Sequence, residues 1–319
     1  MICEKQEAKI ATHRILLTSH QSLLTLKAAR LGCVKYLNAS PLIHGWPGPV
    51  TFDHPSALCA QLARGDLEIA LVSSFEFLRN PIYRIVDGIS ISSDGPVYSV
   101  VVAHLGELSG IKEIELDPAS ETSVNLLRCV LAEIGLKPCL IRNIGRWPVR
   151  PASKTFGAGP GAVDFNSAGE TGNMPLFRTG HRGRLLIGDQ ALRFRHEHEN
   201  EFHFWDLGEE WKKLVDLPFV YAFWLIRPEV EDPKSIANRL RELRDENLAN
   251  LDNLIASLMP GTGDPDRGNG IDAAFCSRYF RKNIRFSFGQ REKQGLGTFT
   301  RLCTKHGLTP NQALVFDLV

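Results

Sequence analysis

The chain has 319 residues, of which 43% are hydrophobic and 23% charged, and its formal net charge is +1. This composition is ordinary for a globular protein with one large domain or two lobes, and the near-zero charge gives no sign of a broad nucleic-acid-binding surface. No apolar run approaches the ~20 residues needed to span a bilayer, so no membrane segment is expected. Binding of an anion would have to come from local groups.

The cysteines and histidines give little sign of metal or disulfide chemistry. The seven cysteines are odd in number, irregularly spaced and free of C-x-x-C pairs, which indicates reduced, mostly buried thiols in a cytoplasmic protein. The ten histidines are scattered, and none lies at metal-ligand spacing from cysteines or acidic residues. We expect neither a metal nor an organic cofactor. Residues 1–30 are interpreted as an N-terminal extension and not as a signal peptide.

The first third of the chain is predicted to alternate strands and helices in a βαβ order. Apolar runs predict strands at 31–37, 50–52 and 67–72. Pro41 suits the first turn of a helix after the first strand, Ser56 is a candidate N-cap for the next helix, and Gly65 is a candidate helix stop. Polar residues follow the strands, which is where α/β folds bind ligands.

The rest of the chain continues the alternation of strands and helices. Strands are predicted at 97–103, 114–116, 185–187 and 219–226, and helices from Ser120, from Ser235, around 275–281 and over 290–305. The strands at 97–103 and 219–226 are interpreted as paired crossings between two lobes. We predict a first lobe from 31–105 and 218–319, and a second lobe over 106–217 with a Gly/Pro-rich insertion at about 145–183.

Asn38 and Ser99 are candidate catalytic residues. Asn38 lies where a strand feeds a helix, and its amide can donate and accept hydrogen bonds at once; the alternative is an ordinary cap or turn residue. Ser99 is at the entrance of a predicted crossing strand, preceded by three further candidates for substrate contact: Gly95, Pro96 and Val97. Strand alternation places Val97 and Ser99 on one face, and a hydroxyl there binds either ligand or neighbouring backbone.

Further candidate substrate-binding residues lie at helix starts and strand ends. A helix that starts near Ser120 offers free N–H groups to an anion, and the hydroxyls of Ser120, Thr122 and Ser123 add donors; ordinary N-capping is the alternative. Ser73 and Ser74 follow another strand, with the same two interpretations. Asp189 follows Gly188 at a strand end, where it would serve as a ligand group or as a brace between lobes.

Strong acid–base groups are scarce among these candidates. Glu76 and Asp94 are possible bases and His44 a possible proton shuttle, but solvated or capping roles are commoner for such residues. No Ser–His–Asp order, nucleophile elbow or dinucleotide fingerprint occurs. The sequence therefore predicts a cleft rich in neutral donors, which fits binding or a reaction that needs little help from protein acids and bases.

Five ordered motifs resemble one known family. V-K-Y-L-N-A-S-P-L, G-D-L-E-I-A-L-V-S-S-F-E-F, S-S-D-G-P-V-Y-S-V, the E-T-S helix start and L-L-I-G-D-Q-A-L are similar to motifs of the chorismate dehydratases, which catalyse the first step of the futalosine route to menaquinone. The order and spacing match from about Leu31 to Pro228, and the stretch from Tyr279 to Leu308 is also similar. The N-terminal extension and the long 145–183 segment depart from the family pattern.

The resemblance implies both a fold and a reaction. The fold is an α/β, two-lobe type 2 periplasmic-binding-protein-like fold with a ligand cleft between the lobes. The reaction converts chorismate to 3-((1-carboxyvinyl)oxy)benzoate and water, with the substrate's own side-chain carboxylate taking the ring proton. The family's key Asn and Ser correspond to Asn38 and Ser99, and no cofactor, nucleic acid or membrane is implied. Monomer and homodimer both remain open.

There are three alternatives, of which a ligand-sensing regulator lobe is disfavoured because no helix-turn-helix precedes Leu31. A sister family with the same fold makes dihydroxynaphthoate, but it has an S-P-C-P-N-D type run where this chain has Tyr36-Leu37-Asn38. A non-catalytic solute-binding protein for small anions would have the same architecture without the chemistry.

Overall fold

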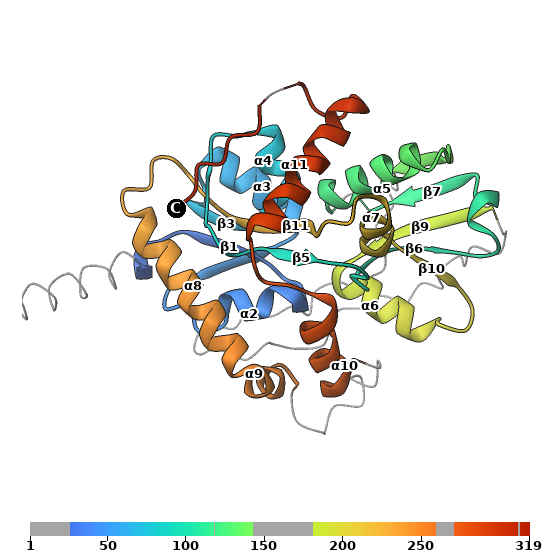
Figure 1. The fold of residues 1–319 in the computed structure, drawn as a ribbon. Coiled ribbons are helices and arrows are strands. Elements are labelled where there is room, and N and C mark those ends of the chain that lie inside the picture. Colours follow the sequence, from blue (N-terminus) through green and yellow to red (C-terminus); the bar gives the residue numbers. More distant parts are fainter. Residues whose placement is uncertain (1–25, 118, 143–180, 260–270, 312) are drawn as a thin grey trace, which may run out of the picture.

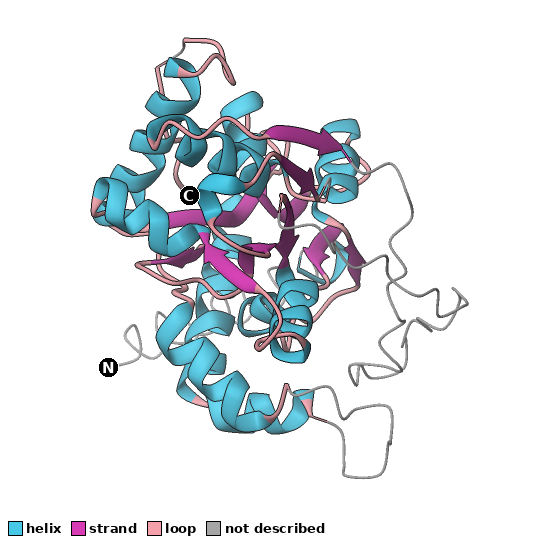
Figure 2. Cartoon of the chain, turned by 90° about the vertical axis from the view of Figure 1, so that its right-hand side faces the viewer, coloured by secondary structure: helices cyan, strands magenta, loops and turns pink. Residues whose placement is uncertain are grey.

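Two β-sheets organise the chain, each with its own helices (Figure 1). The structure is a computed structural model that describes residues 26–117, 119–142, 181–259, 271–311 and 313–319. Figure 2 shows the strands lying between helices on both sides. The architecture is mixed α/β with two lobes, as predicted.

The first sheet is built from the two ends of the chain. Its strands run in the order β2 (Val50–Asp53), β1 (Leu31–Val34), β3 (Ile69–Ser73), β11 (Phe219–Ile226) and β4 (Arg84–Ile85), with β5 (Ile91–Ser93) also paired to β11. β1 is parallel to β2 and β3, whereas β11 is antiparallel to β3. β3 and β11 are buried along their whole length, which explains their unbroken apolar runs.

The helices of the first lobe begin and end where the sequence offers suitable residues. They are η1 (Leu37–Ala39), α2 (Ser40–Ile43), α3 (Pro55–Arg64), α4 (Ser74–Arg79), α8 (Pro233–Ala249), α9 (Leu251–Leu258), α10 (Ala273–Arg278), the π-helix η4 (Tyr279–Asn283) and α11 (Gln290–Lys305). α3 ends at Gly65, which has a left-handed φ of 83° as predicted. Two predicted starts were wrong: α3 begins at Pro55 and not after Ser56, and α8 is capped by Asp232, which accepts from the backbone N–H of Ser235.

The second sheet lies within the middle of the chain. Its strands run in the order β10 (His203–Asp206), β6 (Val100–His104), β9 (Arg182–Ile187), β7 (Glu113–Leu116) and β8 (Cys139–Arg142). Its helices are η2 (Leu108–Gly110), α5 (Glu121–Glu133), α6 (Gly188–Glu197) and α7 (Leu207–Val215). Most of the predicted 145–183 insertion, and residues 1–25 of the predicted extension, lie outside the described residues.

The two predicted crossing strands, at 97–103 and 219–226, lie in different sheets. β6 pairs with β9 and β10 in the second sheet, whereas β11 pairs only within the first. The chain instead passes between the sheets at residues 94–99, where Tyr98 has a positive φ of 69° that breaks the strand. The Asp206 carboxylate holds this bend by accepting from the N–H groups of Val97 at 3.0 Å and Tyr98 at 2.8 Å. The lobe boundaries themselves stay a prediction.

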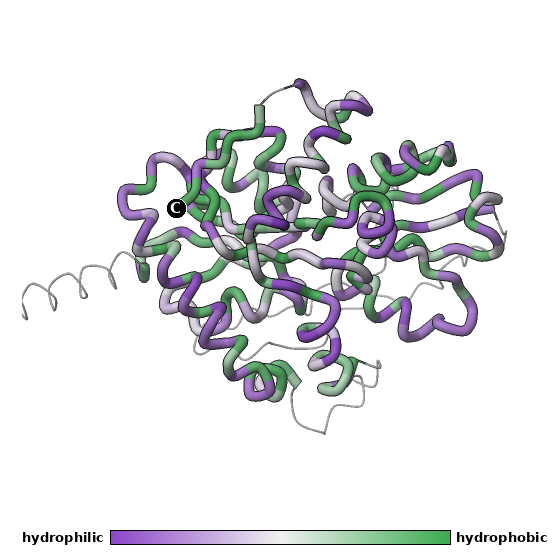
Figure 3. The backbone as a smooth tube through the Cα atoms, viewed as in Figure 1, coloured by the Kyte–Doolittle hydropathy of each residue, from purple (hydrophilic) through white to green (hydrophobic). Residues whose placement is uncertain are grey.

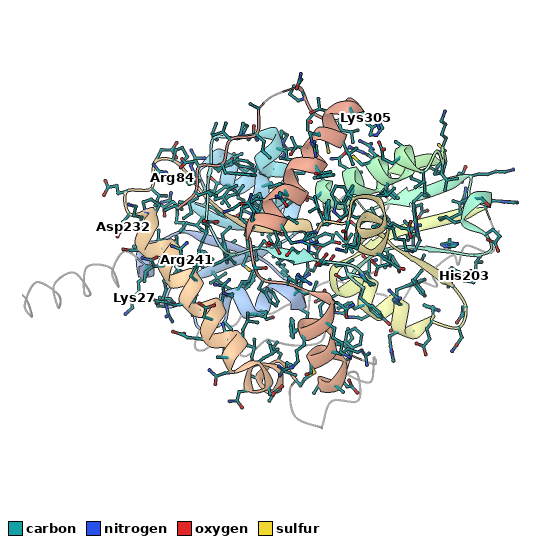
Figure 4. All side chains as sticks on the ribbon, in the orientation of Figure 1. Lys27, Arg84, His203, Asp232, Arg241 and Lys305 are labelled. Atoms are coloured by element: carbon teal, nitrogen blue, oxygen red, sulfur yellow. The ribbon has the colours of Figure 1, made fainter. Side chains whose placement is uncertain are left out.

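An aromatic cluster ties the lobes together beside the second passage, at residues 207–218. Trp211 of α7 packs on Phe219 at 5.1 Å between ring centroids, and Phe219 packs on Phe299 of α11 at 4.9 Å. Figure 3 shows hydrophobic residues gathered along the strands of both sheets. In Figure 4, Lys27, Arg84 and Asp232 lie at the outer edge of the first lobe.

The described cysteines fit the predicted reduced state. All six of them are free, and only Cys139 is exposed. Within the described ranges, no helix combines the length and the apolar character needed to cross a membrane.

Candidate active site

A narrow cavity lies between the lobes, where the passage at residues 94–99 meets both sheets. Its lining comes from the first lobe, the passage and the second lobe: Val34, Tyr36, Asn38, Pro55, Ser73, Ile91, Val97, Ser99, Val100, Ser120, Ser123, Ile187, Gly188, Tyr221 and Ala222. Its volume is about 50 Å³, well below that of pockets that hold drug-sized ligands. The cavity in this structure is therefore smaller than a ring-sized ligand needs.

Asn38 presents an unused hydrogen-bond acceptor at this cavity. It lies in η1, directly after the strand β1, and only 9% of its surface is exposed. Its Nδ2 donates to the Tyr279 hydroxyl at 3.5 Å, whereas its buried Oδ1 has no hydrogen-bond partner among the described residues. An unpartnered buried carbonyl oxygen costs free energy, so it marks a place where a ligand group is expected.

Ser99 lies at the end of the passage and also lines the cavity. It is buried, and its Oγ accepts from the Tyr279 hydroxyl at 2.8 Å. Its backbone carbonyl accepts from the N–H of Gly188 at 2.8 Å, which joins the passage to the start of α6. The fold thus brings the two predicted catalytic residues into one hydrogen-bonded cluster.

Ser120 and Ser123 place two hydroxyls at the N-terminus of α5. Ser120 caps the helix by accepting from the N–H of Ser123 at 3.4 Å, and the Ser123 hydroxyl donates to Ser120 Oγ at 3.2 Å. Both residues line the cavity. Capping and ligand binding, set out as alternatives from the sequence, are therefore compatible here, because the helix dipole still favours an anion at this end.

Thr122 and Ser74 lie behind the cavity and connect the starts of α4 and α5. Thr122 Oγ1 accepts from the N–H of Phe75 at 2.9 Å and is in hydrogen-bond contact with the Ser73 hydroxyl. Ser74 donates to the Val220 carbonyl at 2.7 Å. Of these hydroxyl residues only Ser73 lines the cavity. The Thr122 hydroxyl instead joins α5 to α4, and the Ser74 hydroxyl fixes the start of α4 to β11.

Gly95 and Pro96 shape the passage and do not line the cavity. Gly95 has a φ of 127°, and its carbonyl accepts from the Ser93 hydroxyl at 3.0 Å. The exposed Pro96 accepts from Asn283 Nδ2 at 3.0 Å. Val97, by contrast, reaches the cavity wall.

Asp189 joins the lobes next to Asn38. Its Oδ1 accepts from the N–H of Leu37 at 2.8 Å, linking α6 to η1. Burial raises the pKa of Asp189 to about 6, although the Leu37 N–H and the charge of Arg193 oppose this shift. Asp189 itself does not line the cavity, so the geometry favours a brace between lobes over direct ligand contact.

This brace gives a testable pH dependence. Because the folded pKa of about 6 lies above the ordinary value of 3.8, the folded protein binds more protons than the unfolded one between these pH values, and the contribution of Asp189 to stability falls as pH rises from about 4 to about 6. Asp189→Asn cannot titrate but still accepts from Leu37. Relative to wild type, its free energy of unfolding should rise by about 1–2 kcal/mol across this range, measured by urea denaturation. The same rise in the exposed Asp252→Asn control would contradict the assignment.

The candidate acids and the candidate proton shuttle lie away from the cavity. Glu76 is buried and paired with Arg79, Asp94 pairs with Lys212 at 2.7 Å, and His44 is exposed. Among the described residues, the cavity lining contains no carboxylate, histidine, lysine or arginine. Over the described part of the chain, no group of three or more His, Cys, Asp or Glu residues is placed to hold a metal ion. The site offers hydrogen bonds and shape in place of charged groups.

Three tyrosines at the site were not among the sequence candidates. Tyr36 and Tyr221 line the cavity, and Tyr279 connects Asn38 with Ser99 from behind. Burial raises the pKa of each of the three hydroxyls, so all stay protonated near neutral pH. The Y-L-N motif could have drawn attention to Tyr36. No local sequence pattern indicates a role for Tyr279, which lies 180 residues from Ser99 in the chain.

Comparisons with solved structures confirm the two-lobe fold. Protein AF1704 from Archaeoglobus fulgidus superposes with a TM-score of 0.62 at 14% identity, over 88% of this chain and 97% of that one. The alkanesulfonate-binding protein SsuA from Xanthomonas axonopodis pv. citri, solved with bound MOPS, gives a TM-score of 0.56 at 16% identity, over 90% of this chain and 96% of that one. At these identities the likeness concerns the fold alone, which is periplasmic-binding-protein-like.

Comparisons of sequence are more specific. A chorismate dehydratase from Thermus thermophilus is 27% identical over 289 residues, which cover 84% of this chain and 93% of that protein. A profile of the family described as "Menaquinone biosynthesis" matches residues 29–146 and 162–305. These ranges contain β1, the passage, α5 and every lining residue of the cavity. With a match across most of its length, the chain belongs to the menaquinone biosynthesis family.

Proposed function

We propose that the chain is a chorismate dehydratase, a hydro-lyase that converts chorismate to 3-((1-carboxyvinyl)oxy)benzoate and water. The family and the 27% identical relative named chorismate dehydratase support this activity. The observation that carries it is the pairing of Asn38, with its unpartnered Oδ1, and Ser99 at a cavity whose described lining contains no strong acid or base. Such a site suits a reaction whose proton transfer the substrate performs itself.

The proposed reaction balances without a protein base. The substrate's side-chain carboxylate takes the ring proton, and the electrons of the broken C–H bond form a new ring double bond. The neighbouring C–O bond breaks, and the hydroxyl takes up a proton and leaves as water. Because the ring becomes aromatic, the step is strongly favourable. The protein contributes orientation and preorganised hydrogen bonds, which in other enzymes supply much of the rate enhancement.

The N-terminus of α5 is the proposed site for one carboxylate of chorismate. Ser120 and Ser123 present hydroxyls there, and Ser73 adds a third from the end of β3. The peptide dipoles of this 13-residue helix favour a negative charge at its start. Asn38 and Ser99, at the other side of the cavity, would then orient the ring.

A direct assay tests the proposal. Purified chain incubated with chorismate should yield one aromatic product of the expected mass by liquid chromatography and mass spectrometry. Activity should survive chelation and dialysis, since the substrate supplies every proton and electron pair in the step. If the folded chain binds chorismate by calorimetry but leaves it unchanged, the solute-binding alternative stands. Conversion only of a later, cyclised intermediate to dihydroxynaphthoate would instead identify the sister activity.

A further inference from the structure

Tyr279 connects the two proposed catalytic residues although it does not line the cavity. Its hydroxyl lies 2.8 Å from Ser99 Oγ and 3.5 Å from Asn38 Nδ2, and only 1% of the residue is exposed. It comes from η4, which lies 241 residues beyond Asn38 in the chain. A buried hydroxyl that joins two site residues from such a distance is a candidate positioning group.

The position of Tyr279 is fixed by its surroundings. Its ring stacks on Phe275 with centroids 6.0 Å apart and an interplanar angle of 15°. η4 is a π-helix, a rare local widening that occurs frequently at functional sites. At the other end of η4, Asn283 holds the passage by donating to the Pro96 carbonyl at 3.0 Å. The π-helix therefore contacts the passage at two points, and the Tyr279 hydroxyl has little freedom to move.

The hydrogen bonds around Tyr279 run in one direction. The Asn38 amide donates to the Tyr279 oxygen, and the Tyr279 hydroxyl donates its only proton to Ser99 Oγ. Two consequences follow from the donors and acceptors that each group owns. The hydroxyl proton of Ser99 stays available to a ligand, and the Asn38 amide is turned so that its Oδ1 is left without a protein partner.

We propose that Tyr279 is a positioning residue that sets the direction of the hydrogen bonds from Asn38 to Ser99. The site would therefore select a ring carboxylate that carries a hydroxyl group. The ligand hydroxyl donates to Asn38 Oδ1, and Ser99 donates to a ligand oxygen. The inference builds on the proposed function. In that reaction the hydroxyl takes up a proton as it leaves, so it becomes a stronger donor, and Asn38 Oδ1 stabilises the transition state more than the bound substrate.

A pair of unreactive ligands tests the direction of these hydrogen bonds in the wild-type protein. trans-4-Hydroxycyclohexanecarboxylate and cyclohexanecarboxylate differ only in the ring hydroxyl, and their dissociation constants can be measured by NMR titration. The hydroxylated ligand should bind about five- to tenfold more tightly, as one satisfied buried acceptor predicts. Equal binding, or preference for the plain ring, would mean that the amide presents its NH₂ group to the cavity and would overturn the proposal.

Tyr279→Phe tests the role of the hydroxyl, because it keeps the stacked ring and removes only the oxygen. The preference for the hydroxylated ligand should shrink to less than about twofold, and kcat for chorismate should fall at least about tenfold with a smaller change in KM. The matched control is Tyr83→Phe, another tyrosine that is 1% exposed but contributes nothing to the cavity lining; it should keep both properties. If Tyr279→Phe keeps both the preference for the hydroxylated ligand and the wild-type kcat, the proposal is wrong.

The two hypotheses fail separately. If wild type prefers the hydroxylated ligand and Tyr279→Phe abolishes that preference, the positioning role holds even when chorismate is not converted. If chorismate is converted but the preference is absent, the activity holds and the positioning role is wrong. If circular dichroism shows that Tyr279→Phe does not fold, the two ligands measured on the wild-type protein still decide the direction of the hydrogen bonds from Asn38 through Tyr279 to Ser99.

Discussion

Asn38→Ala is expected to lower kcat by about 10²–10³-fold while KM changes by less than about tenfold. The side chain would orient the ring and stabilise the departing hydroxyl, and both effects are largest in the transition state. The loss of stability should be small, because Asn38 Oδ1 has no protein partner and its Nδ2 makes only one long hydrogen bond. Steady-state kinetics with chorismate and thermal denaturation measure the two quantities.

Asn247→Ala is the matched control for removing a buried amide. Asn247 is 8% exposed against 9% for Asn38, but its Nδ2 donates to the carbonyls of Pro41 at 3.1 Å and His44 at 2.9 Å. Its removal should cost about 1–3 kcal/mol of stability and leave kcat near wild type. The prediction fails if Asn38→Ala retains kcat while a folded Glu76→Gln is inactive, because a protein base would then perform the proton transfer.

Gly295→Ala should lower the free energy of unfolding by about 2–4 kcal/mol. Gly295 lies in the middle of α11, where a Cβ atom would overlap the carbonyl oxygen of Pro218, the residue just before β11. Both sides of this contact are backbone, so neither can move without displacing α11 from the passage between the lobes. Urea denaturation followed by circular dichroism measures the effect.

Gly297→Ala is the control within the same helix. Nothing lies within 4 Å of the Cβ position at Gly297. Alanine there should therefore stabilise the protein by about 0.5–1 kcal/mol, since it gains helix propensity without a clash. Equal effects of the two substitutions on stability would show that the close approach of α11 to Pro218 does not exist in solution.

Several elements of the fold could be predicted because their signals are local. The helix stop at Gly65 and the N-cap at Ser120 occur where the sequence placed them. Such signals act within one or two turns of chain, so they depend little on the rest of the molecule. The predicted starts of α3 and α8 lie within two residues of the observed ones, because Pro55 takes the first helical position of α3 and Asp232 caps α8 ahead of Ser235.

The candidate site could be predicted only in part. Asn38, Ser73, Val97, Ser99, Ser120 and Ser123 meet at one cavity, as the motif order suggested. Ser74 and Thr122 were equally good candidates by residue type, but the Ser74 hydroxyl donates to the Val220 carbonyl of β11 and the Thr122 hydroxyl accepts from the start of α4. A hydroxyl's partner depends on which backbone groups the fold brings within about 3 Å, and local sequence does not determine that.

The sequence by itself determined the two-lobe α/β architecture, the family and the residue types at the strand ends, because periodicity, caps and ordered motifs are properties of short segments. Only the tertiary structure decided that β6 belongs to the second sheet, that Asp189 braces the lobes and that Tyr279 joins Asn38 to Ser99. Each of these facts rests on a contact between segments far apart in the chain. Such contacts form only when the whole chain has folded and brought these segments together, so no local pattern specifies them.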